Sequence, residues 1–497
     1  MHEVVANALK NTNDNLLGFF RFREVNDHYL LVGETGRWIF LTPDDFASLI
    51  RGDLPTESPL YKELADRNLL RPGLNVAKEV RDYQTKNRFT LAGPTLHILI
   101  ATLRCNHVCR YCHASREGMD RTEFDMTPET ADKVLDLVFQ TTAKDITIEF
   151  QGGEPLANYP LVQYVIEQAN ERNKEAGKRL AFSLVTNLSL LNDEMLDYLL
   201  DHHVQICTSV DGPEDLHNKN RTFTCGDSYA ETLHWMRRAN EGYAARGLDP
   251  SLYHVEALLT VTRQSLERHK EIVDTYIEHD LTALFLRPLN PFGFAKGTFA
   301  KIGYTADEFL EFYFKALDYI IERNKQGDDI LERFAAIFLT KMLTPHDPNY
   351  LDIRSPCGAG IGQVAYNYDG RVFTCDEGRM VAQMGDDAFV IGDAATSQYK
   401  DVMEHETVKA IAVASCLDGL PDCIDCAYNV FCGTCPVFNY TEQGNIFQSA
   451  PTNEKCRIHK AIMDRLFGLL QEGDPETVEI LTRWTKTRDR QVFYQAI

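Results

Sequence analysis

The sequence has no long apolar run and little positive charge, and each shortage excludes a class of protein. No stretch approaches the roughly 20 apolar residues that a membrane-spanning helix needs, and the opening residues lack the basic start and apolar core of a secretion signal. The 51 lysines and arginines are outnumbered by 73 acidic residues, which gives a formal charge of -22. Nucleic-acid binding needs a basic surface. We therefore expect a cytoplasmic protein with no membrane or nucleic-acid partner.

Low-complexity tracts and internal repeats are also absent from the sequence, whereas cysteine is plentiful. Hydrophobic residues make up 44% of the 497 residues and charged residues 25%, as is typical of globular chains with several domains. The 13 cysteines are not expected to form disulfides in a reducing cytoplasm, so metal or iron–sulfur ligation explains them better. Cys207 and Cys225 stand alone and fit small buried residues. The others fall in spaced groups.

The first part of the chain predicts a small module of its own. Residues 20–42 alternate apolar and polar side chains around a glycine-containing turn, which favours three short strands. Thr42 followed by Pro43 marks a helix start, and residues 58–70 repeat the spacing of a second helix. We predict that residues 1–78 form a winged-helix-like module.

The following stretch alternates short apolar runs with helical patterns. The runs are residues 96–103, 145–152, 181–187, 204–212, 254–262 and 283–289. Alternating strands and helices imply a parallel sheet, and we predict an α/β fold with a partial, TIM-like (β/α)6 barrel. The predicted boundaries are 92–300 for the barrel, 301–350 for a helical linker, 351–460 for a cysteine-rich domain and 461–497 for a helical tail.

Three cysteines follow the first strand of the predicted barrel. Cys105, Cys109 and Cys112 are separated by three and two residues, and three thiolates on one loop can hold three irons of a [4Fe–4S] cluster. The fourth iron then has no protein ligand and is open to another molecule. Cysteine and histidine at such spacing also make zinc sites, and His107 and His113 lie nearby, so zinc is the alternative.

This triad, with Tyr111 before its last cysteine, resembles the signature of the radical S-adenosylmethionine (SAM) superfamily. The resemblance implies that the amino and carboxylate groups of SAM chelate the open iron. It also implies cofactor contacts from residues at the ends of the second, third and fourth strands, where ligands of parallel sheets bind. These residues are Tyr111, Gly152, Gly153, Glu154, Thr186, Asn187, Ser209, Asp211 and Arg221. Taken singly, each strand-end residue also fits an ordinary turn.

The C-terminal cysteines look like the SPASM domain of radical SAM peptide maturases, in which seven cysteines hold two further [4Fe–4S] clusters. The resemblance implies one cluster on Cys423, Cys426, Cys432 and Cys456 and another on Cys357, Cys375 and Cys435. Two residues rather than the usual three separate Cys432 from Cys435. Cys416 is an additional cysteine that either completes the second cluster or is a bystander. Two zinc ribbons are the alternative.

The resemblance implies an enzyme that cleaves SAM to a 5′-deoxyadenosyl radical, which abstracts hydrogen from a ribosomally made peptide and leads to a crosslink or other oxidative change. SAM and three [4Fe–4S] clusters would be its cofactors, and flavodoxin or ferredoxin its electron donor. Asp376 stands where sulfatase maturases carry a proposed base, although a solvated turn acid is equally consistent with the sequence. The motif order is similar to that of His-Xaa-Ser system maturases, which implies a leader peptide and a second, paired maturase.

Two other functions stay open at this point. One is a sulfatase-type maturase that oxidises a Cys or Ser side chain to formylglycine and needs no leader-binding module. The other is a non-catalytic iron–sulfur or zinc protein, for which the resemblance of Gly152, Gly153 and Asn187 to SAM-binding residues would be a coincidence.

Overall fold

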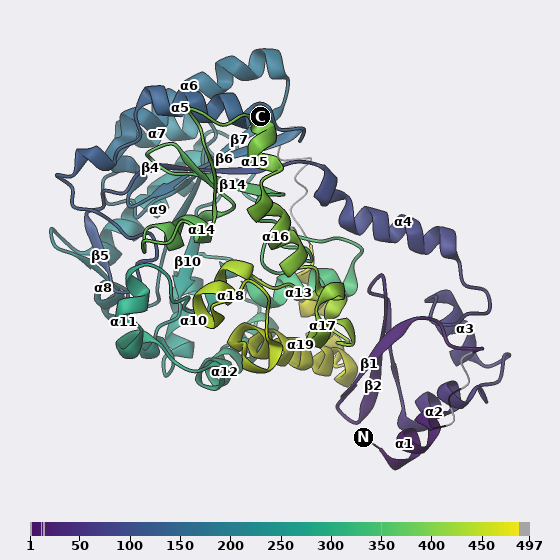
Figure 1. The fold of residues 1–497 in the computed structure, drawn as a ribbon. Helices are drawn as coiled ribbons and strands as arrows, with labels where there is room; N and C mark the ends of the chain where they lie inside the picture. The colour runs from purple at the N-terminus through teal and green to yellow at the C-terminus, as the bar shows by residue number, and fades with distance from the viewer. Residues whose placement is uncertain (1, 11, 13–14, 349, 487–497) are drawn as a thin grey trace.

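A nine-stranded sheet forms the centre of the computed structural model, which describes residues 2–10, 12, 15–348 and 350–486. Its strand order is β12-β10-β8-β7-β6-β4-β14-β15-β16 (Figure 1). The first six are parallel and correspond to the six apolar runs of the sequence. They are β4 (Leu96–Thr102), β6 (Asp145–Gly152), β7 (Arg179–Val185), β8 (Gln205–Ser209), β10 (Glu256–Thr260) and β12 (Leu286–Arg287).

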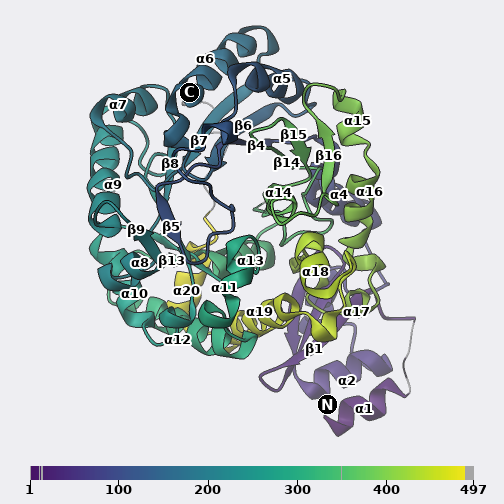
Figure 2. The ribbon, with the colours of Figure 1, turned by 60° about the vertical axis from the view of Figure 1, so that its left-hand side comes forward.

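Helices cover the outside of these strands and close the predicted partial (β/α)6 barrel, so the predicted α/β fold class is confirmed (Figure 2). They are α5 (Pro128–Val138), α6 (Tyr159–Ala176), α7 (Asp193–Asp201), α9 (Ser228–Ala245) and α10 (His269–Glu278). As expected, α5 begins at Pro128, because the Thr127 side chain accepts a hydrogen bond from the Thr130 N–H.

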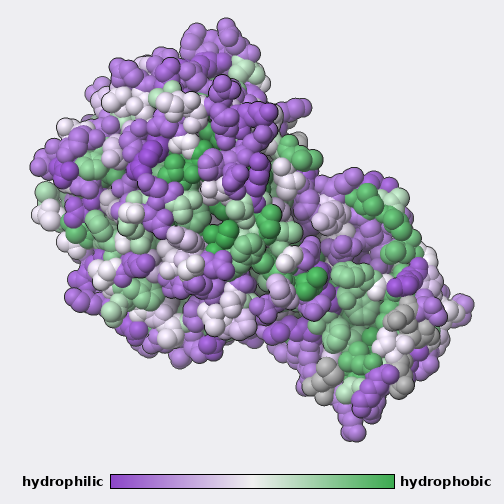
Figure 3. Space-filling view, viewed as in Figure 1, coloured by the Kyte–Doolittle hydropathy of each residue, from purple (hydrophilic) through white to green (hydrophobic). Residues whose placement is uncertain are grey.

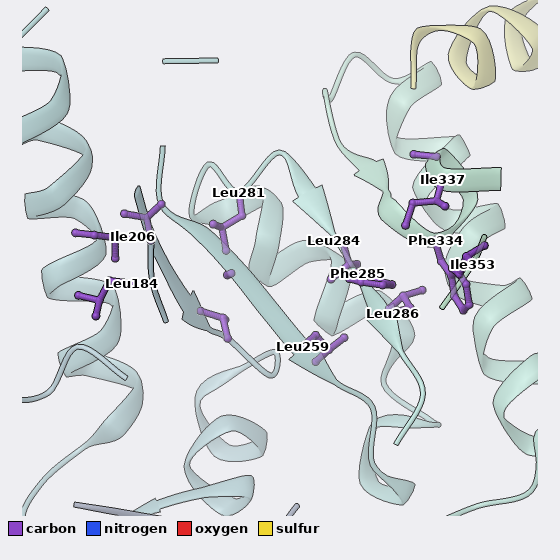
Figure 4. Close-up of a cluster of buried hydrophobic side chains, with 14 of the residues drawn as sticks. Leu184, Ile206, Leu259, Leu281, Leu284, Phe285, Leu286, Phe334, Ile337 and Ile353 are labelled. Carbon is purple, nitrogen blue, oxygen red and sulfur yellow. The ribbon is translucent and has the colours of Figure 1, made fainter. Parts of the chain in front are cut away.

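Side chains alternate along the barrel strands between the helices and the barrel interior. Leu184 of β7, Ile206 of β8 and Leu259 of β10 belong to the main buried apolar cluster (Figure 4). The intervening residues, such as Glu149 and Glu256, are half-buried and face the interior, since successive side chains on a strand point to opposite faces. Polar side chains therefore contribute to the barrel interior.

The cysteine-rich region extends the barrel sheet, which the sequence did not predict. Strand β14 (Gln363–Tyr366) pairs in parallel with β4, and β15 (Arg371–Phe373) and β16 (Val390–Asp393) continue in antiparallel fashion. Short helices complete the region, namely α14 (Asp376–Ala382), α15 (Tyr399–Met403), α16 (Glu406–Ala414), α17 (Pro421–Ile424) and α18 (Pro436–Gln443). The barrel and this region thus share one sheet, which fixes their relative positions.

The N-terminal module contains the three strands and two helices that the sequence predicts. These are β1 (Phe20–Val25), β2 (His28–Gly33), β3 (Trp38–Leu41), α2 (Pro43–Arg51) and α3 (Pro59–Asp66). Thr42 caps α2 and Ser58 caps α3. Two helices were not expected: α1 (Glu3–Leu9), and α4 (Val76–Asn87) in the stretch that the sequence suggested was a polar connection.

Both faces of the module's sheet are covered. One face packs on α1–α3 through residues such as Tyr29 and Leu31, and the other joins the main core through Leu30 and Val32. The Trp38 Nε1 donates to the Met342 carbonyl oxygen at 2.8 Å. An Arg23–Asp464 ion pair, with N–O distances of 2.6 and 2.7 Å, attaches β1 to the C-terminal region. The module is therefore fixed beside α17 and α19 (Figures 1 and 2).

Further helices complete the fold. Helices α12 (Ala306–Lys325), α13 (Arg333–Leu343), α19 (Glu454–Glu472) and α20 (Pro475–Arg483) pack together, and α11 (Phe294–Ile302) packs against Tyr111. Helix α19 runs through the domain boundary predicted at residue 460, and residues 487–497 of the predicted tail lie outside the described residues. Hydrophilic side chains predominate on the face in Figure 3, and no helix within the described ranges has the length and apolar character to cross a bilayer.

Candidate functional site

The loop that carries the cysteine triad is held by a small antiparallel ribbon. Part of the loop forms β5 (His107–Cys109), which pairs with β9 (Arg221–Phe223) so that Cys109 lies opposite Arg221. The Arg110 N–H donates to the Asn220 carbonyl oxygen at 2.9 Å. Because β9 follows the fourth barrel strand, this ribbon fixes the cysteine loop over the carboxyl ends of the strands.

The three thiols of the loop lie close together. Burial raises the pKa of Cys105, and the charges of Glu154, Cys109 and Cys112 raise it further. Burial also raises the pKa of Cys109, to about 11, while the Arg221 guanidinium acts in the opposite direction. Such thiols stay protonated until a metal ion displaces the proton. Three soft donors on one loop suit three irons of a [4Fe–4S] cluster and leave the fourth iron open.

Gly152 and Gly153 bring the end of β6 against the cysteine loop. The Gly153 N–H donates to the Thr102 carbonyl oxygen at 2.8 Å, and the Glu154 N–H donates to that of Arg104 at 2.7 Å. A Cβ on Gly153 would collide with the Leu103 and Arg104 carbonyl oxygens, and Gly152 has φ +142°. The chain's own backbone is thus one close neighbour that requires glycine here, and the cofactor contact implied for Gly152 and Gly153 stays a prediction.

Glu154 ties together the ends of two neighbouring strands. Its buried carboxylate accepts hydrogen bonds from the Thr186 hydroxyl at 2.6 Å, the Asn187 N–H at 2.8 Å and the Leu156 N–H at 3.0 Å. Burial raises the pKa of Glu154, and these hydrogen bonds lower it. The Asn187 side-chain amide reaches Asn106 of the cysteine loop at 3.0 Å. Glu154, Thr186 and Asn187 therefore form one network under the triad.

A second network joins Tyr111, Asp211 and Arg221. The Tyr111 hydroxyl donates to the Asp211 carboxylate at 2.7 Å and accepts from Arg221 Nη1 at 3.0 Å. Burial raises the pKa of Asp211 to about 6, although Arg221 favours its ionised form. Arg221 Nε is buried and has no hydrogen-bond partner among the described residues. This free donor beside the thiols fits an anionic group such as a carboxylate. Ser209 ends β8 nearby and is half-buried.

Seven of the eight C-terminal cysteines gather in two groups. One pocket is lined by Cys423, Cys426, Cys432 and Cys456. The other group, Cys357, Cys375 and Cys435, lies in a separate apolar cluster, and proximity of these thiols adds to the burial that raises the pKa of Cys375. Cys416 is in neither group and lies near Tyr83 of α4. Both groups offer soft sulfur donors that suit iron–sulfur clusters.

Charged side chains lie between the triad and the second cysteine group. Asp376, at the start of α14, is buried and forms an ion pair with the buried Arg379 at 2.8 Å. Arg287, at the end of β12, has the Glu377 carboxylate at 4.0 Å and also lies near Asp376. The sequence analysis did not identify Arg287 as a site residue, although it ends a barrel strand as Ser209 does. No sequence pattern indicated that Arg379 is buried, because its burial depends on how α14 packs.

The model of the radical SAM superfamily matches residues 99–243, which include the cysteine triad, the Gly152–Gly153 turn and Arg221. This chain contains a radical SAM domain. The cysteine-type anaerobic sulfatase-maturating enzyme of Clostridium perfringens is 26% identical over 295 residues, which cover 57% of this chain and 75% of that enzyme. An enzyme of the radical SAM superfamily uses SAM and a [4Fe–4S] cluster.

Solved structures share the fold of the radical SAM domain and its C-terminal extension. The structure of anSMEcpe with bound AdoMet and the Kp18Cys peptide has a TM-score of 0.61 and 20% identity, and the match covers 78% of this chain and 100% of that chain. Streptococcus suis SuiB bound to precursor peptide SuiA has a TM-score of 0.50 and 15% identity, with 88% and 98% covered.

Replacing single C-terminal cysteines tests the two groups. We expect Cys432→Ala to lower the iron content of the anaerobically purified chain by about four atoms, because that cysteine lines the four-cysteine pocket. Cys416→Ala should keep the wild-type iron content, since Cys416 belongs to neither group. Iron analysis and Mössbauer spectra measure the iron content and the clusters of both variants. A loss of iron from Cys416→Ala as large as that from Cys432→Ala would make Cys416 a ligand.

Proposed function

We propose that this radical SAM enzyme reductively cleaves SAM and abstracts hydrogen from a ribosomally made peptide. The observation that carries the proposal is the cysteine triad, with its three thiols gathered at the carboxyl ends of the barrel strands beside the unpartnered Nε of Arg221. When bound, the cluster and SAM supply an electron and a carbon-centred radical precursor. The chain's own residues supply position and charge.

Each part of the site has a distinct task in this proposal. Cys105, Cys109 and Cys112 hold the cluster, and Arg221 offers its free donor to the methionyl carboxylate. The Glu154 network holds the strand ends rigid, which keeps the reacting groups in position. Half-buried polar side chains such as Glu149 and Glu256 face the barrel interior, where the proposal places the target side chain of the peptide. The C-terminal cysteine groups would hold two auxiliary clusters, which would supply an electron acceptor for substrate oxidation.

A peptide substrate is supported by the solved relatives, since anSMEcpe and SuiB have been captured with peptides. The match with anSMEcpe covers all of that chain but only 78% of this one, so about a fifth of this chain has no counterpart there. The match with SuiB covers 88% of this chain. The part of this chain without a counterpart in anSMEcpe supports a peptide maturase that has an additional recognition module.

The outer edge of β3 is the place where we propose that a leader segment binds. Both faces of the module's sheet are covered, so a strand can be added only at an edge. Arg67 Nη1 donates to the Trp38 carbonyl oxygen, which therefore points outward. Because backbone groups alternate along a strand, those of Phe40 point outward too. A leader that pairs with Phe40 would displace Arg67 from Trp38. A second, paired maturase stays a prediction.

Sulfatase-type maturation is the second candidate, and the sequence similarity to the Clostridium perfringens enzyme favours it. A sulfatase-derived peptide with its target Cys separates the two functions. We expect the chain to leave this peptide unmodified, since its N-terminal module points to a substrate with a leader. Reaction of the product with an aldehyde probe after anaerobic turnover measures formylglycine. Efficient aldehyde formation would establish the sulfatase-type activity instead.

Joint replacement of Cys105, Cys109 and Cys112 with Ala tests the first step. Iron should fall from about 12 to about 8 atoms per chain, because only the C-terminal groups remain to hold clusters. Release of 5′-deoxyadenosine under dithionite should stop. The unchanged C-terminal clusters serve as the control for folding, and zinc in place of iron, or continued SAM cleavage, would refute the assignment.

The replacement Asp376→Asn tests the proposed base. With a peptide substrate, we expect product formation to fall by about 10²- to 10⁴-fold, as for loss of a general base, because the amide cannot take the proton. Release of 5′-deoxyadenosine should continue, since Asp376 belongs to the cysteine-rich region and not to the triad. The neighbouring Glu377→Gln is the matched control for loss of one negative charge. If product formation fell equally in both variants, Asp376 would contribute only negative charge and would not act as a base.

A further inference from the structure

A small basic and apolar patch covers the outer side of the cysteine loop. We define this patch as Arg110 and Val108 of the loop, Lys219 of α8 (Glu214–Asn220), and Phe294 and Lys301 of α11. All five side chains are exposed, and Val108 and Phe294 are 42% and 47% exposed. Large apolar side chains at such exposure, together with basic ones, are typical of a protein interface.

Backbone contacts bring the members of the patch together. The Asn220 carbonyl oxygen, next to Lys219, accepts from the Arg110 N–H, and the Thr298 hydroxyl of α11 donates to the Arg110 carbonyl oxygen at 2.9 Å. Phe294, Thr298 and Lys301 share one face of α11, because residues four and three apart lie on the same side of a helix. Strands β5 and β9 and helices α8 and α11 lie side by side in Figures 1 and 2.

The positive charge of the patch is not neutralised within the chain. Among the described residues, the side chains of Arg110, Lys219 and Lys301 form no ion pair or hydrogen bond. Of the acidic side chains near α8, Asp215 pairs with Arg268 at 2.6 Å, Asp227 accepts from the Ala230 N–H at the start of α9, and Glu214 lies at the opposite end of α8 from Lys219. In a chain with a formal charge of -22, Arg110, Lys219 and Lys301 form a local group of unpaired cations.

We propose that this patch is the docking surface for a small acidic one-electron carrier of the flavodoxin or ferredoxin type. The inference rests on the proposed function, because the cluster on the triad needs an electron from outside. Charge complementarity selects the partner: an acidic carrier is repelled by most of this surface and attracted at the patch. The side chains of Val108 and Phe294 would become buried at the centre of the interface, and the three basic side chains of the patch would surround them.

The patch is directly connected to the cysteine triad. Val108 and Arg110 flank Cys109, and the Phe294 N–H donates to the Cys112 carbonyl oxygen at 3.0 Å. In the transfer, the carrier loses one electron and the iron–sulfur group on the triad gains it, so the step needs no other reactant. The opposite side of the loop faces the barrel interior and stays free for SAM and peptide.

Charge reversal tests the docking surface by a binding measurement that does not depend on turnover. The probe is an oxidised bacterial flavodoxin, and the readout is its dissociation constant from the holoenzyme at low and high salt. Combined R110E, K219E and K301E should raise that constant about tenfold or more at low salt and by less at high salt, since steering by charge is screened. The combination K133E, K144E and K409E is the control, because it changes the net charge equally at exposed sites outside the patch.

Reduction experiments add a second readout. Release of 5′-deoxyadenosine with reduced flavodoxin should fall in the patch variant, whereas release with dithionite, a small reductant, should be unchanged. If charge reversal lowers the iron content, the neutral R110Q, K219Q and K301Q combination replaces it. Unchanged flavodoxin binding in the patch variant, or equal weakening in the control, would overturn the proposal. Failure of dithionite to support SAM cleavage would overturn the proposed function, while the binding measurement would still report on the surface.

Discussion

Close contact between two backbone segments is the constraint on which the site depends. The Gly152–Gly153 turn lies against the carbonyl oxygens of the segment that leads from β4 into the cysteine loop, with hydrogen bonds of 2.8 and 2.7 Å. A side chain at Gly153 would push the two strand ends apart. Because the loop is also paired with β9, its three thiols are held over the barrel by backbone on both sides. Side-chain hydrogen bonds of Glu154 then lock the neighbouring strand end to the same place.

Charge is distributed unevenly in this molecule. The outer surface is acidic on the whole, the patch around Arg110 is basic, and the interior between the cysteine groups contains paired charges such as Asp376 with Arg379. Buried pairs of this kind orient their members firmly but stabilise the fold little, because desolvation offsets their attraction. Their retention beside the barrel interior therefore fits a role in substrate chemistry better than a role in stability.

The shared sheet fixes the barrel and the cysteine-rich region relative to each other. Pairing of β14 with β4 makes the cysteine-rich region a continuation of the barrel, so Cys375 and Asp376 approach the barrel interior without a flexible connection. The N-terminal module is attached to α19 of the same region through Arg23 and Trp38. A peptide held at the edge of β3 would thus meet a reaction centre at a fixed distance.

The sequence by itself determined the fold class, the six barrel strands, the caps at Thr42 and Thr127 and the cysteine triad, because periodicity, capping and close spacing depend on neighbouring residues. The two C-terminal cysteine groups were implied by the family resemblance. Helices α1 and α4 and the pairing of β14 with β4 were not predicted. Neither were Arg287 and Arg379 beside Asp376, nor the basic patch, whose members come from three separate segments. Only the tertiary structure decided these features, since each depends on segments that are far apart in the chain and meet through packing.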